Sequence, residues 1–241
     1  MSYRTRPSPN FNDRKLPVSM LVLHYTGMDD AGSAIERLCD PEAGVSSHYV
    51  VAEDGTVTRL VDEDKRAWHA GAGEWRGIDD VNSASVGIEI VNGGHCYGLP
   101  AYPDIQIEAV TRLSQAVLAR HGIKPAGVLG HSDLAPERKL DPGERFPWRV
   151  LASAGVGVWP AAVGGDRTVR HGPDHGWGET LARLQAALRA IGYGERGEGA
   201  YTARTRAVAA AFQRRFRPAH VDGLIDGETA NLIEAVARLT R

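Results

Sequence analysis

Three residues that could carry out metal chemistry lie within one short loop of the chain. Residues 130–143 (GHSDLAPERKLDPG) contain His131, Lys139 and Asp141 within eleven residues. Imidazole and carboxylate are ligands that suit Zn²⁺, and a nearby ammonium group could stabilise negative charge that develops beside the metal. The loop alone is only suggestive, because a hydrolytic metal site also needs a third ligand and a base.

Two further polar residues interrupt apolar runs that predict buried strands. His24 follows residues 18–23 (VSMLVL), at the strand end where open α/β sheets place ligands, although a histidine hydrogen-bonded at the edge of the core is the commoner interpretation. Glu89 lies inside residues 85–92 (SVGIEIVN), where a carboxylate is costly unless it is paired, bound to metal or used in proton transfer. Gly87 shares its face and would leave room for another group to approach. For Glu89 we favour a functional role over a structural ion pair.

Other histidines are candidates for a ligand groove. His48 begins the first of two β-rich runs that flank Asp54-Gly55, a strong hairpin signal. Trp68 and His69 form an adjacent pair before a glycine-rich loop. The pair could line a groove, and Trp68 could equally cap the core.

The elements that must position these residues follow from hydrophobic periodicity. Residues 31–39 and 104–121 predict amphipathic helices, and residues 126–129 predict a short strand that leads to His131. Strands and helices in this order, with polar residues at strand ends, predict an α/β (α+β) fold. We expect a mixed central sheet flanked by helices, with the site along one sheet edge, in a first domain that spans residues 1–160.

A linker and a small helical domain are predicted to follow. Residues 161–177 are Gly-rich and aperiodic, which is typical of a linker. His171 and His175 lie there at a spacing that would suit metal on a helix, but Gly172 and Pro173 between them make a helix unfavourable. We therefore interpret both histidines as linker residues.

Residues 178–241 predict a three-helix domain. The sequence contains a short internal repeat. Glu198-Gly199 stands six residues before Thr205, and Asp222-Gly223 stands six residues before Thr229. Asp226 is a natural N-cap for the last helix. A module of this size is more often a binding domain than a catalytic one.

Composition and charge exclude several functions. A net charge of −2 gives no electrostatic case for nucleic acid or an anionic membrane as a partner. Cys39 and Cys96 are too few for a disulfide framework and too far apart for a zinc ribbon. The polar N-terminal stretch lacks the apolar core of a secretory signal, and no apolar run approaches the about 20 residues that span a bilayer. We expect a cytoplasmic protein without a transmembrane segment; a protein from which a signal had been removed would instead be periplasmic or in the cell envelope.

Four segments together resemble the type-2 family of N-acetylmuramoyl-L-alanine amidases, which is related in fold to T7-type lysozymes and peptidoglycan recognition proteins. They are LVLHYTG (21–27), SSHYVVAEDGTV (46–57), SVGIEIVN (85–92) and GHSDLAPERKLDPG (130–143), in the family's order.

The C-terminal part carries a second resemblance. Residues 178–241 resemble a peptidoglycan-binding type-1 domain through LQAALRAIGY, TRAVAAAFQRRF and VDGLIDGET. Glu198, Thr202 and Asp226 depart from the usual Asp-Gly-x-x-Gly pattern. The three-helix fold should survive these changes, whereas affinity for the wall polymer need not.

The resemblance to the amidases implies a catalytic zinc site. One Zn²⁺ per chain would be held by His24, His131 and Asp141, and a set of three ligands leaves a fourth position for water, as catalytic sites require. Glu89 would be the base that accepts the proton of the attacking water. Lys139 would stabilise the tetrahedral oxyanion.

The remaining site residues are candidates for the substrate groove. His48, Trp68, His69 and Asn82 are expected to bind substrate. Some relatives use a Tyr immediately before the residue that matches His48, but this chain has Ser47 there, which cannot act as such an acid or base. The proton transfers therefore fall to Glu89.

The reaction implied is hydrolysis of the amide between the lactyl group of (anhydro-)N-acetylmuramic acid and L-alanine of the stem peptide. With a cytoplasmic location, the expected partners are soluble peptidoglycan fragments, such as muropeptides and 1,6-anhydro muropeptides from recycling. A homodimer is one assembly that the chain could form.

Other functions are weighed against this one. A non-catalytic peptidoglycan-recognition protein would usually lack a zinc ligand, whereas all three positions are intact. A periplasmic amidase would act on the intact sacculus. A zinc peptidase lacks support because no H-E-x-x-H helix is present, and a serine hydrolase because no G-x-S-x-G elbow is present.

Overall fold

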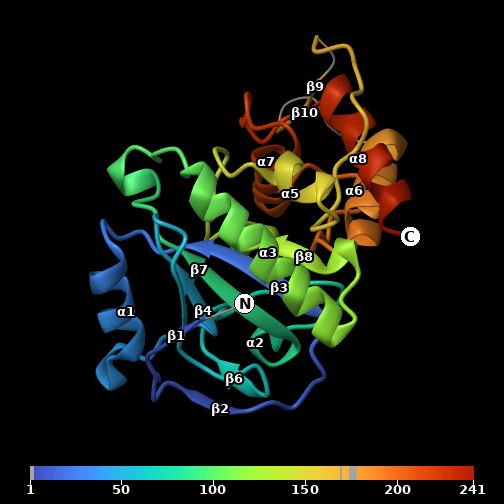
Figure 1. Ribbon diagram of the computed structural model, residues 1–241. Coiled ribbons are helices and arrows are strands. Elements are labelled where there is room, and N and C mark those ends of the chain that lie inside the picture. The colour runs from blue at the N-terminus through green and yellow to red at the C-terminus, as the bar shows by residue number, and fades with distance from the viewer. Residues whose placement is uncertain (1–2, 169, 174–177) are drawn as a thin grey trace.

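A mixed sheet lies at the centre of the molecule. The structure, a computed structural model, describes residues 3–168, 170–173 and 178–241. β7 pairs in parallel with β3 and β4, β3 pairs in parallel with β8, and β4 and β5 are antiparallel. In spatial order (Figure 1) the six strands are β1 (Arg4–Thr5), β5 (Val57–Arg59), β4 (Tyr49–Val51), β7 (Ser85–Ile90), β3 (Met20–Tyr25) and β8 (Val128–Gly130).

Helices and two small strand pairs surround this sheet, which confirms the predicted fold class. The strand pairs are β2 (Phe11–Asp13) with β6 (Lys65–Ala67), and β9 (Arg170–His171) with β10 (Ile225–Asp226). The helices are α1 (Ala31–Cys39), α2 (Val81–Ala84), α3 (Asp104–His121), α4 (His131–Leu134), α5 (Trp148–Ser153), α6 (Glu179–Ile191), α7 (Ala203–Phe216) and α8 (Gly227–Leu239). Short 3₁₀ turns cover Pro41–Ala43, His95–Tyr97 and Pro125–Gly127.

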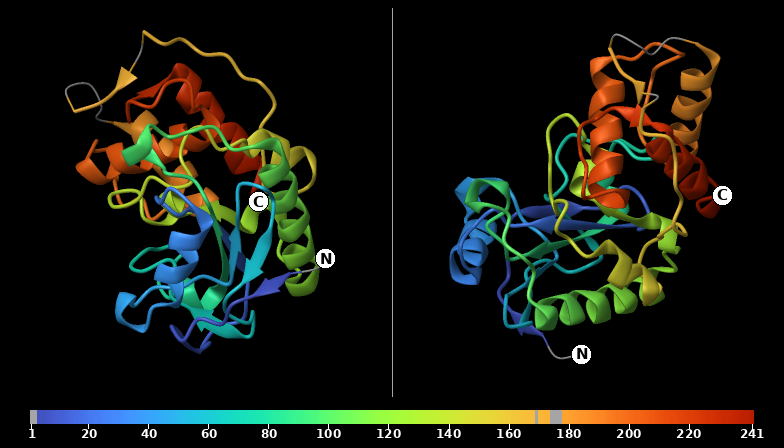
Figure 2. Two further views of the ribbon diagram at one scale, coloured as in Figure 1. Left: turned by 60° about the vertical axis from the view of Figure 1, so that its left-hand side comes forward. Right: turned by 90° about the horizontal axis from the view of Figure 1, so that it is seen from above.

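The alternation of side chains along β3 assigns the two faces of the sheet to different partners. Leu21 and Leu23 lie in the apolar core that includes α3. Met20 and Val22 point to the other face, into a core that includes residues of α6, α7 and α8. Viewed from above (Figure 2, right), α3 lies on one side of the sheet and the C-terminal helices lie on the other. His24 continues the series of Met20 and Val22, so it faces away from α3.

Strand register brings the predicted functional residues to one end of the sheet. His24 on β3 lies directly beside Glu89 on the parallel strand β7. β8 runs parallel to the other edge of β3, with Gly130 opposite Leu23, and His131 follows immediately. The carboxyl ends of three neighbouring parallel strands therefore meet, which is where open sheets bind ligands.

The short internal repeat of the C-terminal sequence corresponds to a repeated hydrogen-bond arrangement. The backbone N–H of Gly199 donates to the amide oxygen of Gln185 at 2.7 Å, and that of Gly223 donates to Gln213 at the same distance. Each glutamine thus fixes the loop that leads into the next helix. Asp226 caps α8, as predicted, by accepting a hydrogen bond from the N–H of Thr229.

The three C-terminal helices share one apolar core with the sheet. Trp75 and Leu134 from the first part of the chain pack in the same cluster of buried residues as Leu184, Leu188 and Phe212. The backbone also connects the two parts, because the N–H of Arg76 donates to the carbonyl of Gly192 at 2.8 Å. The helices are therefore packed against the sheet and are not separated from it.

The segment that joins these parts is only partly described. His171 lies in the short strand β9, which pairs with β10, and His175 lies outside the described residues. The division of the chain into a first domain (1–160), a linker (161–177) and a three-helix domain (178–241) stays a prediction. Within the described ranges, none of the helices combines the length and apolarity needed to cross a bilayer.

Candidate metal centre

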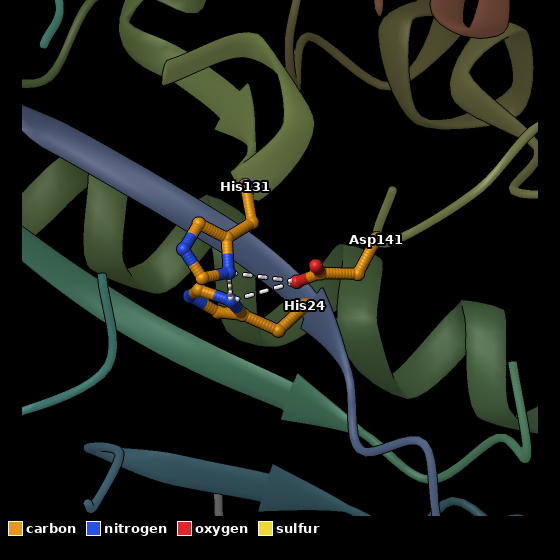
Figure 3. Close-up of side chains that lie close together, drawn as sticks. All are labelled: His24, His131 and Asp141. Atoms are coloured by element: carbon orange, nitrogen blue, oxygen red, sulfur yellow. Dashed lines mark hydrogen bonds and ion pairs between the residues drawn. The ribbon is translucent and has the colours of Figure 1, made fainter. Parts of the chain in front are cut away.

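Three ligand atoms converge at the end of the sheet (Figure 3). Nδ1 of His24, Nδ1 of His131 and Oδ2 of Asp141 lie 3.0 Å from one another. All three residues are buried, and they form a group that could hold a metal ion. They come from β3, from the start of α4 and from the loop that follows α4.

The hydrogen bond of His131 determines its tautomer. Nε2 lies 2.8 Å from the carbonyl oxygen of Ala70. A carbonyl oxygen can only accept, so the proton of the neutral ring is on Nε2. Nδ1 of His131 therefore presents a bare lone pair to Asp141.

A relay of buried groups fixes His24 in the same way. Ser85 donates its hydroxyl proton to the carbonyl of Val81 at 2.6 Å, so it accepts from Nε2 of His69 at 3.3 Å. Nδ1 of His69 is then an acceptor, and it receives the Nε2 proton of His24 at 3.0 Å. Burial and the neighbouring His131 lower the pKa of His24 to about 4, which keeps the ring neutral at pH 7.

These assignments leave two imidazole lone pairs and one carboxylate oxygen facing each other. Three acceptors at this separation repel one another unless a cation lies among them. Two nitrogens and one oxygen are a donor set that suits zinc and leaves an open position. The chemistry of the donor set therefore fits a divalent metal, and the relays are the outer hydrogen bonds that orient metal-ligating histidines.

Glu89 and Lys139 line the same site as the three ligand residues. Oε2 of Glu89 is shielded from solvent and has no hydrogen-bond partner among the described residues. Burial, aided by the charge of Asp141, raises the pKa of Glu89 well above its ordinary value, and Lys139 acts in the opposite direction. A carboxyl group with a raised pKa is suited to taking up and returning a proton.

One cavity contains all five predicted metal-binding and catalytic residues. It has a volume of about 270 Å³, and Trp68 and His69 also line it. Trp68 is held by its own N–H, which donates to Ser46 Oγ at 2.8 Å, and by its indole N–H, which donates to Asn12. An indole fixed beside the ligand group could form one wall of a substrate groove.

His48 and Asn82 lie behind the cavity. His48 is fully buried, accepts a hydrogen bond from the N–H of Gly87 and lies 3.0 Å from the carbonyl of Lys65. The side-chain oxygen of Asn82 accepts from the N–H groups of His69 and Ala70. These positions do not favour contact with substrate. Asn82 instead holds the backbone of His69 and Ala70, which supply the partners of the metal ligands. His48 holds β7 two residues before Glu89.

The comparisons with known proteins agree with this geometry. Residues 14–144, more than half of the chain, match the family described as N-acetylmuramoyl-L-alanine amidase. The chain belongs to that family. Residues 178–233 of this amidase also match a family described as a peptidoglycan binding domain.

Three relatives describe the extent of the likeness. The amidase is 38% identical to N-acetylmuramoyl-L-alanine amidase AmiD of Escherichia coli over 233 residues, which cover 91% of this chain and 82% of AmiD. The structure of AmiD with anhydro-N-acetylmuramic acid-L-Ala-D-γ-Glu-L-Lys matches with a TM-score of 0.78 at 36% identity, over 97% of this chain and 93% of that one. AmpDh3 of Pseudomonas aeruginosa, bound to an anhydromuramic pentapeptide, matches with a TM-score of 0.77 at 30% identity, over 97% and 95%.

A shorter relative matches less of the amidase. The 1,6-anhydro-N-acetylmuramyl-L-alanine amidase AmpD of E. coli is 32% identical over 173 residues, which cover 92% of AmpD but 62% of this chain. AmpD therefore has no counterpart for about a third of this chain.

The sequence did not identify the groups that fix the two histidine ligands. Ala70 acts through its carbonyl oxygen, which every residue possesses, so its type carries no signal. Ser85 lies within the strand segment that carries Glu89, but its role appears only when His69 lies next to it. His69 was expected to bind substrate, and its ring also supports His24.

Proposed function

We propose that this amidase is a zinc enzyme that hydrolyses the amide between the lactyl group of N-acetylmuramic acid and L-alanine of a stem peptide. The observation that carries the proposal is the convergence of three lone-pair atoms, from His24, His131 and Asp141, in one cavity. A buried carboxyl oxygen of Glu89, which has no hydrogen-bond partner in the described part of the chain, lies at the same cavity. Membership of the family supports the reaction type.

His24, His131 and Asp141 would hold the metal through Nδ1, Nδ1 and Oδ2, in the tautomers fixed by His69 and by the carbonyl of Ala70. Bound zinc supplies a Lewis acid, which polarises a carbonyl group and lowers the pKa of water toward about 7. The fixed rings need no rearrangement to present their lone pairs, so the site is organised before the metal enters.

Glu89 and Lys139 divide the remaining chemistry. Glu89 accepts a proton from the attacking water and returns it to the amine of L-alanine as the amide bond breaks. Lys139, which lines the same cavity, stabilises negative charge on the former carbonyl oxygen. The raised pKa of Glu89 brings its proton affinity closer to that of its reaction partners.

The substrate class we propose is the soluble muropeptide with an anhydro sugar. Two of the similar structures hold ligands of this kind, an anhydro tripeptide in AmiD and an anhydro pentapeptide in AmpDh3. The cytoplasmic location and the homodimer stay predictions.

The test is product analysis by mass spectrometry after digestion of a purified anhydro-muropeptide and of intact sacculi. We expect a free stem peptide and an anhydro sugar from the soluble substrate, at a higher rate than from sacculi. Cleavage within the stem peptide, or wild-type activity after chelation of the metal, would contradict the proposal.

Glu89→Gln in the same assay tests the assigned base. The substitution keeps the shape of the side chain and removes its ability to carry the proton, so turnover should fall by about 100-fold or more. Metal content should stay near one ion per chain. Glu108→Gln, on the exposed side of α3 where Glu108 pairs with Arg112, is the matched control and should leave turnover unchanged.

A further inference from the structure

One arginine of the C-terminal helices is buried in the first part of the chain. Arg215 lies near the end of α7, and its side chain reaches the turn between β8 and α4. Nη1 lies 2.7 Å from Oδ2 of Asp133, and Nη2 donates to the carbonyl of Val128 at 3.0 Å. The guanidinium thus binds both sides of the turn that presents His131.

Asp133 receives hydrogen bonds from both parts of the chain. Its Oδ2 also accepts from the backbone N–H of Gly130 at 2.9 Å, and its Oδ1 accepts from the hydroxyl of Tyr193 at 2.7 Å. The first of these bonds closes the turn at the residue before His131. The second, like that of Arg215, comes from the C-terminal part.

The surroundings of this ion pair leave it little freedom. The side chains of Arg215 and Asp133 are 5% and 1% exposed, and the guanidinium lies 4.2 Å from the ring centroid of Trp148. Removing one partner of such a pair strands a buried charge, so each partner requires the other. The turn is also crowded on its far side, because a Cβ atom at Gly130 would lie 2.8 Å from the ring of Pro142, which follows Asp141.

We propose that Arg215 is a positioning residue for the metal site: the C-terminal part uses it, through Asp133, to fix the turn that orients His131. The C-terminal helices then contribute to metal retention, in addition to any contact with the cell-wall polymer. The inference rests on the proposed metal site but not on the identity of the substrate.

The test uses Arg215→Met in the full chain, since Met retains much of the apolar volume and lacks the charge and donors. Zn²⁺ affinity is measured by competition with a chromophoric chelator at a temperature where the variant is folded by circular dichroism. We expect the dissociation constant to rise by about 10-fold or more, as for other outer partners of metal ligands. The Co²⁺-substituted variant should show altered d–d bands, which report ligand geometry.

Arg217→Met is the matched control. Arg217 is two residues away, is also 5% exposed, and forms buried ion pairs with Asp226 and Glu228 inside the C-terminal part. Its loss should destabilise the same helices and leave Zn²⁺ affinity and the Co²⁺ spectrum unchanged. An equal loss of affinity in both variants would mean that general stability is responsible, and would overturn the inference.

A double-mutant cycle with Asp133→Asn tests the route. If Arg215 acts through Asp133, Arg215→Met should cost less affinity in the Asp133→Asn background than in the wild type. Additive losses, or wild-type affinity in Arg215→Met, would overturn the inference. A wild-type chain that binds no Zn²⁺ would instead contradict the proposed function, so the two failures are distinguishable.

Discussion

Burial determines the charge of His48. His48 is fully buried, and burial, followed by the nearby charge of Arg14, lowers its pKa to about 3. The carbonyl of Lys65 and the charge of Glu63 raise the pKa of His48, and His121 lowers it further. The two raising effects do not outweigh the loss of hydration. A neutral ring is also what the backbone requires, because Nδ1 accepts the N–H of Gly87.

This histidine should contribute to the pH dependence of stability. Its pKa in the folded state lies below the ordinary value of 6.5, so the folded chain binds fewer protons than the unfolded chain between these values. The contribution is therefore fully present above pH 6.5 and is lost as the pH falls toward about 3. As the pH falls over this range, the free energy of unfolding measured by urea titration should decrease less steeply for His48→Gln than for the wild-type chain. Equal slopes in wild type and His48→Gln would refute the assignment.

The sequence predicted the residues of the metal site well and the surroundings of His48 poorly. The residue types and order of His24, Glu89, His131 and Asp141 pointed to a metal site, because ligands and bases must come from a few side-chain types. The sequence placed His48 in the groove, whereas the structure buries it behind the cavity. No periodicity distinguishes a histidine that faces substrate from one that accepts a backbone N–H.

At the scale of elements, β7 is the strand that organises the site. Its apolar residues Val86, Ile88 and Ile90 pack toward α3, and the opposite face carries Gly87 and Glu89. The alternation, the hairpin at Asp54-Gly55 and the bounds of α3 all followed from the sequence. The space beside Gly87 was predicted as well, but its occupant, the ring of His69, comes from a distant loop and could not be.

Gly87→Ala should test how tightly this face is filled. A Cβ atom at Gly87 would lie 2.5 Å from Cγ of His69, an atom close to the backbone that cannot swing away. We expect a loss of about 1–3 kcal/mol in the free energy of unfolding, and weaker Zn²⁺ binding because His69 would leave Nε2 of His24. Gly164→Ala, where a Cβ atom meets nothing within 4 Å, is the control for urea titration and chelator competition. Unchanged Zn²⁺ affinity in Gly87→Ala would show that His69 does not support the ligand.

At the scale of the whole molecule, one apolar core joins the sheet to the C-terminal helices. Met20, Val22 and Leu129 from the sheet belong to the same cluster as Leu184 and Phe212. The sequence predicted the three helices from their own periodicity, but it gave no sign that they share a core with the sheet. The C-terminal helices pack on the face of β3 that α3 leaves free, and only the tertiary structure shows which face that is.

The shared core predicts a single cooperative unfolding transition. Leu184→Ala, at a fully buried position of α6, should lower the free energy of unfolding of the whole chain by about 2–5 kcal/mol. Near-UV circular dichroism, which reports the aromatic residues around the sheet, and far-UV circular dichroism should shift together in urea. Leu239→Ala, at a position that is 50% exposed, should leave both unchanged. Two separate transitions would contradict the shared core.

The ion pair between Arg215 and Asp133 also limits how such a protein can be assembled in evolution. A catalytic domain and a wall-binding domain are commonly regarded as exchangeable parts joined by a linker. Here a graft of another three-helix domain would have to bring an arginine to the same place, or leave Asp133 a buried charge without its partner. The two parts of the chain should therefore be inherited together, and a gene fusion that supplied only the helical fold should bind Zn²⁺ more weakly than the natural pairing.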